Sequence, residues 1–332
     1  TKMAGIAKGF STGSCPSYLA QKIHPVLSHA VPRLKFCDIG VNILDEMFAG
    51  TYHSKHYHPA DRDLLFERAA AFGVDHIICT ATTLEESKQT LDFCRSFNGA
   101  KVTSDGMRLY STVGIHPTRC NEISTEVDII SQLDSILADG VSDKTVVAIG
   151  ECGLDYDRLN FCSKEVQLVG FRKQIDLISK FNLPAFFHNR NTDGDFLKIV
   201  TEERHKITAG GVVHSFTGSM EEMLQLTQLG FYIGINGCSL KTDENLLVAK
   251  AVPEELLLLE TDAPWCGIKP THASFKHVAS KFSTVKKEKF QMGYMVKDRN
   301  EPCAIIQVLE VLAAIRSTDT NTLAEQVFTN SQ

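Results

Sequence analysis

The sequence alternates short runs of apolar and β-branched residues with segments of helical periodicity, and this unit occurs eight times. Several runs, such as those at 146–149 and 256–259, are almost continuously apolar, which is typical of strands covered on both faces in a parallel sheet. Eight strand–helix units predict an α/β fold, a single-domain (β/α)8 TIM barrel, with a doubly wound open sheet as the structural alternative. The strands are expected at residues 34–41, 76–82, 109–115, 146–151, 184–189, 210–216, 231–236 and 256–263.

The segments between these runs carry helix signals. Residues 167–178 place their apolar side chains on one helical face, and Ser219 followed by Glu222 predicts a capping box at the start of another helix. Further helices are expected at 61–71, 84–97 and 305–316. Residues 1–33 precede the pattern as an N-terminal extension, and residues 266–299 form a long insertion after the eighth strand. The barrel domain is therefore expected at 34–332.

Cysteine usage and hydropathy indicate the class of protein. The ten cysteines are scattered without a CxxC pair, which indicates reduced thiols of an intracellular protein rather than a disulfide or zinc framework. No apolar run approaches the ~18 residues that a membrane span needs. We expect a cytoplasmic or nuclear monomer with no membrane partner. The extension 1–33 contains no acidic residue, which leaves import into an organelle open.

Charge is distributed unevenly. Residues 266–300 contain eight basic and two acidic side chains, whereas the rest of the chain carries a net charge of −12. An acidic body with one basic stretch can bind a polyanion at one place, and the alternative is a solvated loop.

Four residues with metal-ligating side chains fall at the ends of predicted strands. Glu151, His188, His214 and Asp262 end the fourth, fifth, sixth and eighth strands. In a parallel barrel these ends open on one face, and two imidazoles with two carboxylates suit a divalent cation. Each residue alone fits a structural role, such as a half-buried histidine or a turn aspartate, but their joint occurrence favours a metal site.

Six motifs then resemble, in order along the chain, those of the TatD family of metal-dependent deoxyribonucleases, which have an amidohydrolase-like barrel. The resemblance extends from about Lys35 to the last residues, and the segment 297–303 looks like the eukaryotic branch of the family. The motifs are DIGVN (38–42), GIHP (114–117), IGECGLD (149–155), FHNR (187–190), HSFTG (214–218) and ETDAP (260–264).

The resemblance implies roles for individual residues. Glu151, His188, His214 and Asp262 would be the metal ligands, with Glu151 as the bridge if two ions bind. Glu151, Asp262 and His116 would be the catalytic residues, His116 by contacting the scissile phosphate or assisting proton transfer. The implied activity is 3′–5′ exodeoxyribonuclease action on single-stranded DNA or 3′ ends, in DNA degradation or repair.

Substrate contacts are expected from basic and aromatic side chains. Arg190 is a candidate phosphate donor, with a salt bridge to a neighbouring carboxylate as the alternative. Trp265 is expected to pack against the barrel rather than to stack on bases. Further phosphate contacts are expected from the basic loop at Lys286, Lys287 and Lys289, and further base stacking at Phe275, Phe290 and Tyr294.

The sequence departs from the wider superfamily at the end of the first strand. Many members carry His-x-His there, and the corresponding positions are Gly40 and Asn42. The loss of two imidazoles favours Mg²⁺ or Mn²⁺ over Zn²⁺ and argues against a tightly held second ion, so one or two ions are expected. Restoring histidine at both positions is expected to tighten a second ion.

Two other functions remain open. One is a metal-dependent amidohydrolase-type enzyme acting on a small molecule or an aminoacyl ester. The other is a non-catalytic nucleic-acid-binding barrel.

Overall fold

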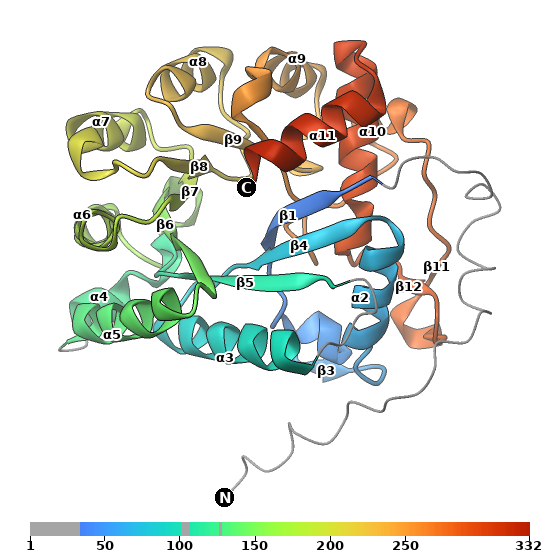
Figure 1. Ribbon diagram of the computed structural model, residues 1–332, viewed down its shortest axis with the longest axis horizontal. Helices are drawn as coiled ribbons and strands as arrows, with labels where there is room; N and C mark the ends of the chain where they lie inside the picture. The colour runs from blue at the N-terminus through green and yellow to red at the C-terminus, as the bar shows by residue number, and fades with distance from the viewer. Residues whose placement is uncertain (1–33, 101–105, 126–127) are drawn as a thin grey trace, which may run out of the picture.

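The computed structural model describes residues 34–100, 106–125 and 128–332 of the chain. Eight parallel strands form one sheet in the order β1-β4-β5-β6-β7-β8-β9-β10. The two ends of the sheet meet, because Val41 in β1 pairs with Ala263 beyond β10, and the Asp262 amide donates to the Gly40 carbonyl (2.9 Å). The sheet is therefore closed, which confirms the barrel and excludes the open sheet. Figure 1 shows the helices arranged around these strands.

All eight predicted strands are present, but several end earlier than expected. β8 and β10 have three residues each, so His214 and Asp262 lie in the loops just beyond them. β6, in contrast, continues past Glu151 to Asp155. The strands are β1 Phe36–Val41, β4 Val74–Cys79, β5 Arg108–Val113, β6 Val146–Asp155, β7 Ala185–Arg190, β8 Gly211–Val213, β9 Tyr232–Ile235 and β10 Leu257–Leu259, and the hairpin β2 Thr51–Tyr52 and β3 Lys55–His56 follows β1.

The predicted helices are also present. Ser219 caps α8 by accepting a hydrogen bond from the Glu222 amide (3.1 Å). The Glu222 carboxylate, however, accepts from the Asn189 side-chain amide (2.7 Å), so the reciprocal half of the expected capping box is replaced by a contact with β7. The helices are α2 Arg62–Ala71, α3 Leu84–Ala100, α4 Asn121–Thr125, α5 Ile129–Ser142, α6 Lys164–Phe181, α7 Asp195–Glu202, α8 Met220–Gln228, α9 Asp243–Ala251, α10 Ile305–Arg316 and α11 Thr320–Asn330.

Apolar side chains form two buried clusters. The larger one lies between the strands and the surrounding helices. The smaller one fills the interior of the barrel with residues from five strands, among them Ile39, Phe186 and Leu258. The barrel is thus a packed core, and polar side chains gather above this apolar layer, at the carboxyl ends of the strands.

Residues 266–299 contain only short elements, namely η7 Ala273–His277, β11 Thr284–Val285, η8 Lys287–Lys289 and β12 Met295–Val296. The far end of this segment is held by buried ion pairs. Arg299 binds Asp61 (2.6 Å) and Glu301 (2.9 Å), and Arg68 of α2 binds Glu301 (2.7 Å). The predicted extension 1–33 lies outside the described residues. Within the described part of the chain, no helix has the length and apolar character to cross a membrane.

Candidate metal centre and nucleic-acid site

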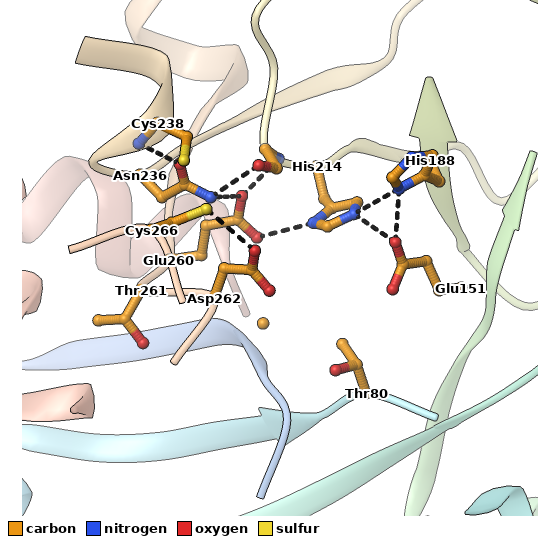
Figure 2. A network of polar contacts seen from close by, with 12 residues as sticks. Thr80, Glu151, His188, His214, Asn236, Cys238, Glu260, Thr261, Asp262 and Cys266 are labelled. Atoms are coloured by element: carbon orange, nitrogen blue, oxygen red, sulfur yellow. Dashed lines mark hydrogen bonds and ion pairs between the residues drawn. The ribbon is translucent and has the colours of Figure 1, made fainter. Parts of the chain in front are cut away.

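Glu151 is the centre of a buried cluster of imidazoles at the carboxyl end of β6. Its Oε1 atom lies 2.6 Å from Nδ1 of His188, 2.8 Å from Nε2 of His214 and 3.4 Å from Nε2 of His116. Figure 2 shows two of these rings, those of His188 and His214, turned toward the Glu151 carboxylate. Ring nitrogens of His188 and His214 beside one carboxylate oxygen form a donor set that fits a divalent cation.

The protonation states within this cluster are strongly coupled. Burial by itself would raise the pKa of Glu151, but the charge of His214 and hydrogen bonds from His188 and His214 hold it well below its usual value. Burial would likewise lower the pKa of His214, yet the carboxylates of Glu151 and Glu260 raise it well above the usual value. Without a cation, His214 is therefore a protonated partner of two carboxylates.

A second carboxylate orients each of two histidines. Nε2 of His188 lies 3.2 Å from Oδ2 of Asp155, and Nδ1 of His214 lies 3.4 Å from Oε2 of Glu260. A ring nitrogen that donates to a carboxylate leaves the other nitrogen with its lone pair for a metal ion. In both rings that other nitrogen is the one directed at Glu151, and it would give up its proton when a cation binds.

His116 differs from these two rings, because its nitrogen nearest Glu151 is the one that carries the proton. Its Nδ1 accepts a hydrogen bond from the Thr118 amide (3.1 Å), so a neutral ring carries its proton on Nε2, the nitrogen nearest Glu151. Burial lowers the pKa of His116 to about 3, which keeps the ring neutral. Although potential ligand atoms of His116, Glu151 and His188 all lie within 4.8 Å of one another, this tautomer makes His116 a hydrogen-bond donor to the site.

Asp262 lies on the other side of the cluster and forms its own contacts. Its Oδ1 accepts from the Asn42 side chain (2.9 Å) and its Oδ2 from the Cys266 thiol (3.2 Å). Figure 2 shows Asp262 and Glu151 on opposite sides of His214. Burial raises the pKa of Asp262 to about 7, so this carboxyl group exchanges its proton near neutral pH.

Glu260 fills the space that a histidine at position 40 would need. A Cβ atom on Gly40 would lie 2.6 Å from Oε2 of Glu260. The Glu260 carboxylate is fixed, because it also accepts from the Ser215 amide and from the Asn236 side chain (3.1 Å). A histidine at position 40 would therefore require the Glu260 carboxylate to move, and the tighter binding of a second ion in that variant stays a prediction.

Sequence reasoning missed three functional residues that the structure brings to the cluster. Asp155 and Glu260 stand inside the recognised motifs, and Asn42 had been considered only as a poor replacement for histidine. Their signal in the sequence was proximity to the strand ends. What they contact depends on packing between segments that are distant in the chain.

The four predicted substrate contacts have different environments. Arg190, at the end of β7, forms no ion pair with any described residue, although it pairs in register with the strand residue Asp155. The Lys287 ammonium group lies over the rings of Tyr52 (4.8 Å) and Tyr57 (4.7 Å). Lys286 and Lys289 are exposed.

The predicted aromatic contacts also differ from one another. Phe290 stacks on His58 with ring centroids 4.2 Å apart and is therefore part of the packing of the loop. Trp265 was expected to pack against the barrel, but 51% of its surface is exposed.

The family model described as "TatD related DNase" matches residues 47–332. This chain belongs to the TatD family. The match confirms the family that the six motifs indicated, a family of metal-dependent hydrolytic nucleases.

TatD relatives of known name and structure cover nearly the whole chain. The "Deoxyribonuclease Tat-D" of Schizosaccharomyces pombe is 40% identical over 91% of this chain and 96% of the relative. A "3'-5' ssDNA/RNA exonuclease TatD" of Erwinia tasmaniensis is 31% identical over 89% of this chain and 97% of the relative. The crystal structure of a hydrolase of the TatD family from Entamoeba histolytica has a TM-score of 0.84 and 39% identity, and covers 90% of this chain and 97% of that one.

Proposed function

We propose that this protein hydrolyses phosphodiester bonds of DNA and removes nucleotides from the 3′ end, in a reaction that depends on a divalent cation. The convergence of three imidazoles on Glu151, in a chain that belongs to the TatD family, carries this proposal. The names of its relatives, two deoxyribonucleases of yeasts and a bacterial 3′–5′ exonuclease, support the substrate class and the polarity.

The cation would be held by Oε1 of Glu151, Nδ1 of His188, Nε2 of His214 and a carboxylate oxygen of Asp262. We propose Mg²⁺ or Mn²⁺, one or two ions, rather than Zn²⁺, because carboxylate oxygens make up half of the ligands and no cysteine is among them. A cation at this place polarises a phosphoryl oxygen and lowers the pKa of a water molecule.

The protein's own residues would supply the proton chemistry. His116 would donate from Nε2 to a phosphate oxygen, because its neutral tautomer carries the proton on that nitrogen. Asp262 would accept the proton of the attacking water through the carboxylate oxygen that does not bind the cation. Arg190 and Lys286, which form no ion pair with described residues, would bind neighbouring phosphates, with Lys287 and Lys289 contributing further along the strand.

The test is a time course with a 5′-labelled single-stranded DNA in Mg²⁺, in Mn²⁺ and with EDTA. A ladder that shortens by one nucleotide at a time from the 3′ end, only with metal, is the expected result. Intact DNA under every metal, from protein shown to be folded, would instead favour a small-molecule or aminoacyl-ester hydrolase or a non-catalytic binding barrel.

We also propose that the protein works as a monomer in a reducing compartment, the cytoplasm or the nucleus, on DNA undergoing degradation or repair. The nine described cysteines are free, which fits such a compartment. Light scattering of the purified protein and localisation of a tagged chain test these two points.

A further inference from the structure

A cavity of about 660 Å³ lies between the segment that follows β1 and the 266–299 insertion, and Trp265 is one of its lining residues. Each of the two segments that form the cavity wall includes, or closely follows in the chain, a residue that is hydrogen-bonded to Asp262. The Trp265 amide donates to the Asp262 carbonyl (2.8 Å), and Asn42, which binds the Asp262 carboxylate, stands shortly before the wall residues Asp45 and Glu46. The cavity wall is therefore tied to Asp262 through the backbone of Trp265, and the cavity volume lies in the ~300–1,000 Å³ range of small-molecule sites.

Trp265 lines this cavity with an accessible indole ring. Half of its surface is exposed, although tryptophan is a side chain that proteins usually bury to a large extent. The hydrogen bond from the Trp265 amide to the Asp262 carbonyl fixes the backbone that carries the ring. A rigid, exposed aromatic ring in a cavity is a surface on which a planar ligand can stack.

The charges of the cavity select the kind of ligand. Because basic and acidic side chains nearly balance, the wall as a whole does not attract phosphate, and a neutral aromatic group suits it better than an anion. The hydroxyl groups of Thr51 and Ser54 add hydrogen-bonding capacity of the kind that a base edge can use. The charged residues are Lys286, Lys287 and Lys297 against Asp45, Glu46, Glu288 and Asp298.

Two of the lysines remain available at the edge of this balanced surface. Lys286 and Lys297 are both exposed, and neither forms an ion pair with a residue that the structure describes. Lys287, in contrast, lies over the two tyrosine rings. A base inside the cavity would thus have cationic groups nearby for the phosphates on either side of it.

We propose that this cavity is a subsite for one nucleobase of an unpaired strand, stacked on Trp265, next to the phosphodiester that is cut. The inference rests on the proposed nuclease function and goes beyond it, because it explains why an unpaired strand would be held rather than a duplex. A base in a stacked pair cannot turn its face to an indole ring, whereas an unpaired base can.

Trp265 is the single tryptophan of the chain, so fluorescence excited selectively in tryptophan reports on this subsite alone. The protein is titrated in Mg²⁺ with a phosphorothioate-linked oligothymidylate, which resists hydrolysis, and with a matched oligomer of abasic sugars. We expect saturable quenching with the first and much weaker quenching with the second. Equal quenching by both oligomers, or none at a concentration that inhibits cleavage of ordinary DNA, would overturn the subsite.

Two substitutions at Trp265 distinguish aromatic stacking from simple contact with an apolar side chain. Trp265→Leu is expected to raise KM for single-stranded DNA on the order of 10-fold, within the range of one base stack, while kcat changes little. Trp265→Phe is expected to recover most of this loss, because it keeps an aromatic face. Equal KM values for the Leu and Phe variants would contradict stacking.

Cleavage of ordinary DNA by the same preparation distinguishes the two proposals. Cleavage without a Trp265 signal refutes the subsite and leaves the nuclease standing. Base-dependent quenching without cleavage refutes the nuclease and leaves a base-binding site.

Discussion

Glu260→Gln tests whether the carboxylate behind His214 sets the tautomer of that ring. Glutamine is nearly the same size, and its carbonyl oxygen can still accept from the Ser215 amide and from Asn236. Its amide group would then face Nδ1 of His214, where a carboxylate oxygen now lies at 3.4 Å. Nδ1 would have to accept rather than donate, and the ring proton would move to Nε2, the nitrogen directed at Glu151.

The structure indicates the size of the effect. Loss of a carboxylate that orients a ligating histidine typically costs 10–100-fold in metal affinity or activity. The contact in question is long, and removing Glu260 also lowers the pKa of His214, which reduces competition from the proton. We therefore expect the lower end of that range, a loss of about 10-fold, or about 1.4 kcal/mol.

The assay is calorimetric titration of Mn²⁺, together with nuclease rates as a function of Mn²⁺ concentration. Glu222→Gln is the matched control, because that carboxylate lies on the same face of the barrel but binds Asn189. We expect excess Mn²⁺ to restore much of the rate of Glu260→Gln, and we expect Glu222→Gln to behave as wild type. An unchanged Mn²⁺ affinity in a folded Glu260→Gln variant would refute the reasoning.

Four further predictions follow from individual contacts. Burial raises the pKa of Asp262 to about 7, so its carboxyl group is mostly protonated at pH 6 and mostly ionised at pH 8. Cation binding at pH 6 should therefore release about one more proton from wild type than from Asp262→Asn, and this difference should vanish at pH 8. Calorimetry in two buffers with different ionisation enthalpies measures the number of protons released. Arg299→Met leaves the two buried carboxylates Asp61 and Glu301 with Arg68 as their remaining shared partner among the described residues. The variant should lower the free energy of unfolding in urea by about 3–5 kcal/mol, and a loss below about 1 kcal/mol would count against the network. Gly40→Ala should destabilise the protein by about 1–3 kcal/mol and weaken Mn²⁺ binding, because the new Cβ meets Glu260; wild-type values for both would contradict the close approach. Lys286→Ala should reduce the slope of log affinity for single-stranded DNA against log salt by about 0.7, with an unchanged slope excluding a phosphate contact.

The local pattern of apolar and polar residues was sufficient to predict the barrel architecture and most of the residues of the site. Strand and helix periodicities are properties of neighbouring residues, so the eight units could be predicted from the chain alone. The carboxyl ends of parallel strands share one face of a barrel, so Glu151, His188 and His214 could also be predicted to meet.

Strand ends were predicted less accurately because side chains compete with the sheet for backbone amides. Ser215, for example, donates its amide to the Glu260 carboxylate rather than to a neighbouring strand, and β8 ends before it. Periodicity contains no information about such a competitor.

What the sequence determined by itself was the alternation that builds the barrel and the residue types at its carboxyl face. Only the tertiary structure decided which nitrogen of each histidine faces the site, that Glu260 occupies the space beside Gly40, and that Trp265 is exposed in a cavity. The physical reason is distance along the chain: Glu260 meets His214 across 46 residues, and Arg299 meets Asp61 across 238. Hydrogen bonds and clashes of this kind exist only after the chain has closed on itself.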